Sequence, residues 1–258
     1  MKNKLEDLIK TLRTLRDENG CEWNRKQTHH TLVPYLLEET YEVIEAIVNE
    51  DYELLKEELG DLLLHVIFQA ELADEKKIFN IYDSISNINQ KLINRKPHIF
   101  SDPNNDEWKK GNWEVAKKNE KNRESILDGV PKALPSLTRA RRIQEKAAGI
   151  GFDWDNLDNV FDKIYEEIDE LKEAIKSKQK IKVQNELGDV IFSIVNLSRH
   201  IECDPELSLG HSTNKFIKRF HTLEQYMQKN NLDFAKQSLT KLDEIWNIVK
   251  KKERSNQE

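Results

Sequence analysis

The fold of this chain is decided by EETYE at residues 38–42 and EELGD at residues 57–61, because the same pattern returns later. Residues 166–170 read EEIDE, and residues 185–189 read NELGD. Each stretch ends on two acids three residues apart, and the gap between the paired stretches is equal in both halves, since 58 − 42 = 186 − 170 = 16. A three-residue gap places both acids on one helical face. The repeat therefore predicts two helices in each half that present an acidic pair.

The repeated acids form two sets of four carboxylates. Oxygen donors that converge between helices suit a hard divalent cation, so we expect Mg²⁺, with Mn²⁺ as a substitute. The sets are Glu39, Glu42, Glu58 and Asp61 in the first half, and Glu167, Glu170, Glu186 and Asp189 in the second half.

Apolar spacing predicts that these acids face the interior. Glu58 and Asp61 lie on a stripe that runs from Leu54 to Leu72 in alternating steps of four and three. Unpaired carboxylates in an apolar interface would cost several kcal/mol each, so we expect a cation to compensate them. A structural salt-bridge network is the alternative interpretation, but few basic residues share these stripes. Gly60 and Gly188, between the acids, indicate either a close helix approach or simply a small packing position.

The chain as a whole is predicted to be all-α, because only eight glycines and six prolines interrupt long stretches with helical apolar spacing. Each half would then wrap a four-helix core. The expected helices are 3–17, 28–49, 51–74, 81–95, 106–121, 134–148, 158–177, 180–201, 206–229 and 234–252.

The duplication predicts two tandem domains. We expect a first domain at residues 1–122 and a second at 134–258. The linker would be 123–133, where Gly129 and Pro131 break a charged stretch.

Basic and aromatic pairs also recur after the acids. On spacing alone they would decorate a solvated face, but beside a metal site Lys and Arg can hold phosphate oxygens and Trp can stack on a base. The other tryptophans are interpreted as packing residues. The pairs are Lys91 and Arg95, Trp113 and Lys117 in the first half, and Lys215 and Arg219, Trp246 and Lys250 in the second.

Composition excludes several functions. A net charge of −6 gives no general attraction to nucleic acid or anionic membrane. No apolar run has membrane-spanning length. No P-loop or GxGxxG motif occurs, and a di-iron bundle would need Glu-x-x-His where this chain has Glu-x-x-Asp. Cys21 and Cys203 lack zinc-type spacing and are expected to be reduced thiols of a cytoplasmic protein.

The acidic motifs, together with GCEWNRKQTHHTLVPYLLEETYE, RKPHIF and GFDWDN, closely resemble the MazG family of nucleoside triphosphate pyrophosphohydrolases, in its two-domain bacterial form. The resemblance runs from about Leu12 to Lys250. It implies an all-α homodimer that completes its helix bundles by dimerisation and uses Mg²⁺ to convert an NTP or dNTP to the monophosphate and pyrophosphate. It also implies a role in removing aberrant nucleotides and in stress. The competing class is a helical regulator that binds nucleotide or protein without turnover.

The resemblance also implies roles for individual residues. The metal ligands match Glu167, Glu170, Glu186 and Asp189, and the nucleotide-binding residues match Lys215, Arg219, Trp246 and Lys250. The resemblance further implies that activity resides mainly in the second half. The first half has Glu22 and Asn24 in place of the family's Pro and Asp, which bears on its substrate handling more than on its metal site. The general base stays open. Glu166, and Glu38 in the first half, are the candidates, although each could equally point to solvent.

Overall fold

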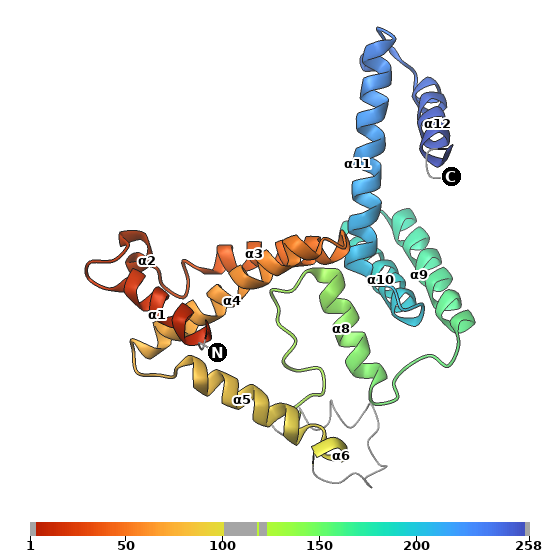
Figure 1. The fold of residues 1–258 in the computed structure, drawn as a ribbon. Coiled ribbons are helices and arrows are strands. Elements are labelled where there is room, and N and C mark those ends of the chain that lie inside the picture. The colour runs from red at the N-terminus through yellow and green to blue at the C-terminus, as the bar shows by residue number, and fades with distance from the viewer. Residues whose placement is uncertain (1–3, 101–117, 119–122, 256–258) are drawn as a thin grey trace. The chain divides into compact units, whose positions relative to one another are not determined.

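The computed structural model describes residues 4–100, 118 and 123–255, and every regular element in these ranges is a helix (Figure 1). The all-α prediction is confirmed. The chain divides into two compact units, Met1–Glu107 and Trp108–Glu258. None of the described helices is long and apolar enough to cross a membrane.

In the first unit, α3 and α4 pack together as a hairpin, α1 contacts both α2 and α4, and α5 contacts α4. The described helices of this unit are α1 (Lys4–Arg16), α2 (Glu22–Lys26), α3 (Val33–Val48), α4 (Tyr52–Asp74), α5 (Ile81–Asn94) and α6 (Pro97–Phe100).

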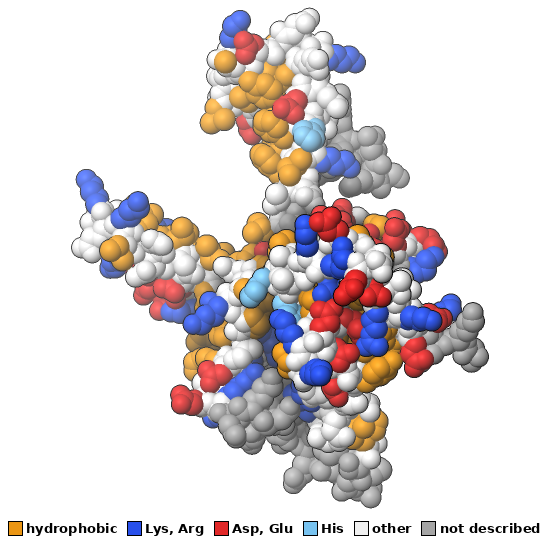
Figure 2. Space-filling model, turned by 90° about the vertical axis from the view of Figure 1, so that its left-hand side faces the viewer, with side chains coloured by type: hydrophobic (Ala, Val, Ile, Leu, Met, Phe, Trp, Pro, Cys, Tyr) orange, Lys and Arg blue, Asp and Glu red, His pale blue; other side chains and the backbone are white. Residues whose placement is uncertain are grey.

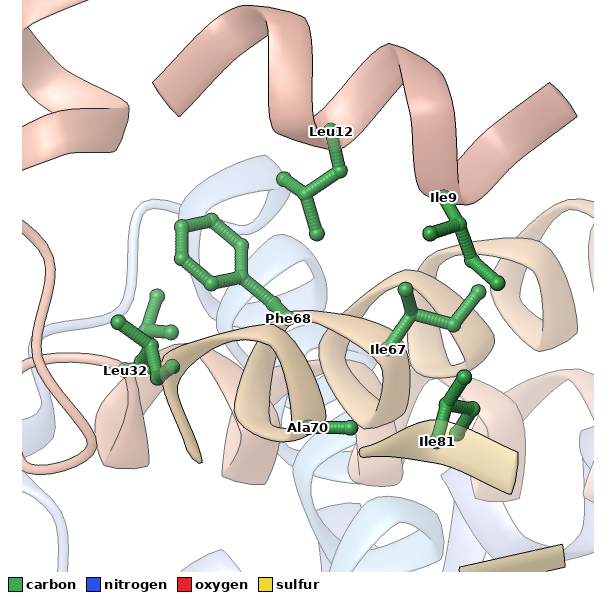
Figure 3. Close-up of a cluster of buried hydrophobic side chains, with 8 residues drawn as sticks. Ile9, Leu12, Leu32, Ile67, Phe68, Ala70 and Ile81 are labelled. Carbon is green, nitrogen blue, oxygen red and sulfur yellow. The ribbon is translucent and has the colours of Figure 1, made fainter. Parts of the chain in front are cut away.

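The hydrophobic core of the first unit lies where α1 meets the C-terminal half of α4 (Figure 3). Ile9 and Leu12 of α1 point toward Ile67 and Phe68 of α4, and Ile81 joins them from the start of α5. Each such buried side chain stabilises the fold by roughly 1.5–3 kcal/mol. The acidic pair of α4 lies N-terminal to this cluster, so the core holds in place the helix that carries the pair.

In the second unit, α9 and α10 form the matching hairpin, α8 packs on α10, α11 contacts α8 and α10, and α12 packs on α11. The elements are α8 (Ser136–Ala148), α9 (Leu157–Ser177), α10 (Lys180–His200), α11 (Pro205–Lys229), a 3₁₀ turn η1 (Phe234–Lys236) and α12 (Leu239–Ser255).

The two hairpins share a turn as well as their acids. Glu50, between α3 and α4, has φ 55°, and Lys178, between α9 and α10, has φ 57°. Their separation equals that of the acids, because 178 − 50 = 167 − 39 = 128. A left-handed backbone at a non-glycine residue costs roughly 1–2 kcal/mol. The duplication therefore extends to a backbone conformation that neither residue type favours.

The predicted helix at 28–49 begins later than expected. The hydroxyl of Thr31 accepts a hydrogen bond from the Thr28 backbone at 2.8 Å, and the hydroxyl of Thr28 accepts one from the Thr31 backbone at 3.2 Å. These local bonds compete with helical ones, so α3 starts at Val33.

Other helix boundaries also differ. The helix expected at 234–252 begins at Leu239, because Asp233 accepts a hydrogen bond from the Ala235 backbone and closes a separate 3₁₀ turn. The short helices α2 and α6 were not predicted. The helix expected at 106–121 falls outside the described residues except for Lys118.

Candidate active site

The α3–α4 hairpin brings the first acidic set together. One carboxylate oxygen from each of Glu39, Glu58 and Asp61 lies within 4.8 Å of the other two. Glu42 contacts both Glu39 and Glu58. Burial, followed by the charges of Asp61, Glu42 and Glu58, raises the pKa of Glu39. Burial, followed by the charges of Glu42 and Asp61, raises the pKa of Glu58. The acids therefore repel one another, and a bound cation would relieve that repulsion.

The α9–α10 hairpin repeats this geometry. One carboxylate oxygen from each of Glu167, Glu170 and Glu186 lies within 4.8 Å of the other two. Glu167 is 7% exposed, whereas Glu170 lies at the surface. Asp189 does not belong to this trio, but it lines a cavity together with Glu167.

The prediction that all eight acids face an apolar interior is wrong for Asp61, Glu170 and Asp189, which are exposed. Helical periodicity identifies the face on which a residue lies, but it does not show whether another element covers that face. The acidic ends of the hairpins are open in the single chain, and only Glu167 is fully buried there.

The two glycines between the acids do not mark a close helix approach. A Cβ atom added to Gly60 or to Gly188 would meet no heavy atom within 4 Å among the described residues. Their repetition has no packing reason in the structure.

The donor sets suit a hard divalent cation. All candidate ligands are carboxylate oxygens, which Mg²⁺ and Mn²⁺ prefer. Oxygens on opposite sides of Mg²⁺ stand about 4.2 Å apart, twice the usual Mg–O distance. A spacing of up to 4.8 Å therefore needs only small side-chain rotations to close around an ion.

Lys163 distinguishes the second cluster from the first. Its ammonium lies 2.8 Å from a carboxylate oxygen of Glu167 and 2.9 Å from one of Glu166. Hydrogen bonds to Glu167 and then Glu166 raise the pKa of Lys163. The matching position of the first half, 35 + 128 = 163, holds Tyr35. The second cluster thus includes a cation of its own, and Lys163 could have been found by its four-residue spacing from Glu167.

His65 is buried beside the first cluster. It is 8% exposed, its ring stacks on Tyr35 at 6.5 Å between centroids, and its Nε2 lies 3.9 Å from Glu39. Burial lowers the pKa of His65, and the charge of Asp61 only partly offsets this effect. We therefore expect His65 to be neutral at pH 7 and to serve packing more than charge compensation.

The predicted Lys–Arg pairs lie on helices other than those that carry the acids. Lys91 is in the last turn of α5, and Arg95 caps that helix. Lys215 and Arg219 lie one turn apart on α11. Glu166, the candidate general base, is exposed and pairs with Lys163.

Trp246 and Lys250 lie on α12. The Trp246 ring is 5.3 Å from the ring of Phe216 and borders the apolar cluster between α11 and α12. This contact gives Trp246 a packing role, whatever else it does. Trp113 and Lys117, their predicted counterparts, lie outside the described residues.

A cavity of about 470 Å³ adjoins the second acidic cluster. It lies among α8, α9, α10 and the loop between α8 and α9. Phe152 and Trp154 of that loop line it, as do Glu167 and Asp189. Trp154 is 45% exposed, so the interpretation of this residue as a packing anchor is wrong.

Sequence reasoning missed the cavity because its walls come from three helices and a loop. Gln144 of α8, a buried amide in its wall, carries no recognisable sequence signal. Its place depends on how α8 packs against α10.

Comparison with known proteins gives consistent matches. The sequence model of one protein family, described as the MazG nucleotide pyrophosphohydrolase domain, matches residues 27–100 and 156–224 of this chain. The chain is 45% identical over 247 residues to the Thermotoga maritima nucleoside triphosphate pyrophosphohydrolase/pyrophosphatase MazG, covering 95% of each chain. It is 40% identical over 261 residues to the Escherichia coli K12 nucleoside triphosphate pyrophosphohydrolase, covering 97% of this chain and 98% of the relative. Both acidic sets fall inside the matched regions.

Proposed function

The chain belongs to the MazG family of nucleotide pyrophosphohydrolases, and from this premise we propose that it hydrolyses nucleoside triphosphates, deoxynucleotides included, to the monophosphate and pyrophosphate. The observation that carries the proposal is the convergence of carboxylates from two helices in a hairpin, which occurs in both halves. Such a cluster brings several anionic oxygens together. It is suited to holding a cation against a polyphosphate.

Glu167, Glu170 and Glu186 would hold Mg²⁺ in the second half, with Asp189 as the fourth ligand and Mn²⁺ as a substitute. The cation, when bound, supplies positive charge that offsets the charge developing on the triphosphate and favours ionisation of the attacking water. Glu39, Glu42, Glu58 and Asp61 would hold a second cation in the first half.

The chain's own residues would position the substrate. Lys215 and Arg219 bind phosphate oxygens, and Trp246 and Lys250 bind the nucleotide from α12. Glu166, exposed beside the cluster, accepts the proton of the attacking water. Its partner Lys163 lies 2.9 Å from the carboxylate and limits the directions in which it can turn.

We place turnover mainly in the second domain, residues 134–258, after a linker at 123–133. The first domain, residues 1–122, serves assembly, substrate preference or regulation. Its nucleotide-binding residues would be Lys91, Arg95, Trp113 and Lys117.

A homodimer is the proposed assembly. An apolar side chain exposed in a single chain is a candidate for burial against a second copy. Figure 2 shows hydrophobic side chains gathered at the top of the view, where α11 and α12 lie. The exposed large hydrophobic residues of α11 are Leu207, Leu209, Phe216, Ile217 and Phe220.

The proposed setting is the cytoplasm, where the free thiols of Cys21 and Cys203 stay reduced. There the enzyme would remove aberrant nucleotides and adjust nucleotide levels under stress. With a net charge of −6, it is not expected to bind nucleic acid directly.

The test is a product analysis. The protein is incubated with a panel of NTPs and dNTPs, with Mg²⁺ or with a chelator, and the products are separated. We expect monophosphate and pyrophosphate, and only with the cation. Release of orthophosphate with the diphosphate, or no turnover of any nucleotide, would reject the proposal and favour a non-catalytic regulator.

A further inference from the structure

The cavity beside the second acidic cluster has walls suited to a flat aromatic ligand. Phe152 and Trp154 line it from the loop, and Phe192 lines it from α10. Phe152 is 81% exposed and Trp154 is 45% exposed, so both rings present aromatic surface that a ligand could cover. Aromatic side chains bind planar rings by stacking or edge contact.

The loop that carries these rings is anchored at its middle. Arg199 of α10 donates a hydrogen bond to Asp153 at 2.8 Å, and His200 lies 3.1 Å from the same carboxylate. Burial alone would raise the pKa of Asp153, but hydrogen bonds and charge from Arg199 outweigh it and lower the pKa. The ionised carboxylate thus holds the loop on α10 at neutral pH.

The cavity also reaches the acids. Glu167 and Asp189 belong to its lining, and Glu167 belongs to the carboxylate trio as well. A molecule with a planar ring in the cavity could therefore extend a phosphate chain toward the acidic cluster. A nucleotide has both parts.

Gln144 adds a polar group of defined orientation. It is 7% exposed, and its Nε2 donates a hydrogen bond to the backbone oxygen of Phe192 at 2.8 Å. This bond orients the amide, because the reverse orientation would set two carbonyl oxygens against each other. The remaining atom, Oε1, is buried and has no hydrogen-bond partner among the described residues. An unpaired buried oxygen of this kind favours a ligand that brings an N–H group.

We infer that this cavity takes the nucleobase of the substrate, and that Gln144 Oε1 accepts a hydrogen bond from an exocyclic amino group. Adenine and cytosine carry that group, whereas hypoxanthine and uracil carry a carbonyl oxygen in its place. Two facing acceptors repel each other, so the amino bases are preferred. The inference rests on the proposed function, since it assigns the base of that reaction's substrate.

The inference also moves base stacking from Trp246, where the sequence predicted it, to the cavity. Trp246 already packs against Phe216, and the cavity supplies other aromatic rings. Oε1 is buried, so the base would reach it only after neighbouring side chains rotate, as is common on binding.

The experiment compares matched substrates. Initial rates of pyrophosphate release give kcat/KM for CTP against UTP and for ATP against ITP, at one fixed Mg²⁺ concentration. We expect the wild type to prefer the amino base about tenfold in each pair, the effect of roughly one hydrogen bond. Gln144→Leu should bring both ratios close to one. Ser193→Ala should leave them unchanged, because this cavity residue already donates its hydroxyl to Val190 of its own helix.

Calorimetric binding of CMP and UMP without metal provides a readout that does not depend on turnover. CMP should bind about tenfold more tightly than UMP, and Gln144→Leu should remove the difference. Trp154→Ala, an exposed loop substitution that should not disturb folding, should weaken both monophosphates alike.

The possible failures can be told apart. If no triphosphate yields pyrophosphate, the proposed function fails, and the CMP and UMP comparison still tests the cavity. If both members of each pair react and bind equally, or if Gln144→Leu keeps the wild-type ratio, the inference is overturned while the pyrophosphohydrolase proposal stands.

Discussion

Lys163 gives the second acidic cluster an internal cation, and Tyr35 gives the first cluster none. The raised pKa of Lys163 means that its ion pairs contribute stability below the ordinary lysine pKa and lose it only as pH rises through the folded pKa. The pairs are therefore intact at neutral pH. A metal ion that uses Glu167 must share this carboxylate with Lys163, whereas Glu39 has no such competitor at the matching position.

The first prediction concerns the ligands of the second cluster. Glu170→Gln and Asp189→Asn should each lower kcat at least a hundredfold while leaving the helical fold intact, because each replaces an anionic oxygen without creating a cavity. Circular dichroism checks the fold, and pyrophosphate release checks activity. Asp169→Asn is the matched control, since this exposed neighbour pairs only with Lys172 among the described interactions. Near wild-type activity in both ligand variants would show that the cluster is structural.

The second prediction concerns the first cluster without metal. The pKa of Glu39 is raised in the folded state, so the folded protein holds this proton more tightly than the unfolded chain does. Stability should therefore fall as pH rises above the ordinary glutamate pKa toward the raised value. Glu39→Gln removes this loss, so the variant should be more stable than wild type at pH 7 in chelator and similar at pH 4.

Urea unfolding at both pH values, with and without Mg²⁺, measures this effect. Mg²⁺ should stabilise the wild type more than Glu39→Gln. Glu53→Gln, on the exposed start of α4, is the control. A variant less stable than wild type at pH 7 in chelator would contradict the repulsion seen in the cluster.

At the scale of elements, the hairpin is the repeated unit. Two helices, a turn with one left-handed residue and two acidic pairs occur in both halves at a constant offset of 178 − 50 = 128. Side-chain N-caps start one helix of each hairpin: Asp51 caps α4, and Asn156 caps α9. Each such cap stabilises its helix by about 1 kcal/mol. Local signals thus support the placement of both acidic pairs.

The third prediction concerns the α11–α12 pair. Trp246→Ala should lower stability by about 1–3 kcal/mol, because the contact with Phe216 is lost. It should also raise KM several-fold, because that contact holds α12, the helix that carries the proposed nucleotide-binding residue Lys250, against α11. Trp246→Phe should retain most of both properties, since its ring can still pack there. Lys250→Ala should raise KM without lowering stability. Saturation kinetics and thermal unfolding separate these effects, and unchanged KM in both alanine variants would remove α12 from nucleotide binding.

At the scale of the whole molecule, two similar units carry two similar clusters, yet their surroundings differ. In the described part of the first unit, Tyr35 and His65 lie beside the acids. In the second unit, Lys163 and the cavity with its aromatic lining lie beside the acids. A cavity lined by aromatic side chains lies next to the acids of the second unit. This difference agrees with the proposal that turnover resides there.

The fourth prediction tests that asymmetry. Glu42→Gln should reduce kcat much less than Glu170→Gln, by under about tenfold against a hundredfold or more. Both variants are measured at saturating Mg²⁺, and gel filtration checks that they keep the wild-type assembly. Equal losses would mean that both halves catalyse or are strictly coupled. A larger loss for Glu42→Gln would move the main site to the first half.

The sequence by itself determined the all-α class, the duplicated hairpins and the convergence of acids within each half. These follow from local physics, because helical spacing sets the direction of each side chain around its own axis. A short turn between two helices is enough to bring together the acids of each hairpin, Glu39 with Glu58 and Glu167 with Glu186.

Only the tertiary structure decided which of these acids are covered and what lies beside them. Asp61 and Glu170 were expected to be buried, but both side chains are exposed, and none of the described helices covers them. The cavity needs Gln144 of α8 against Phe192 of α10, two residues on different helices. Spacing along one helix cannot encode such a contact, because burial depends on which other helix packs against that face.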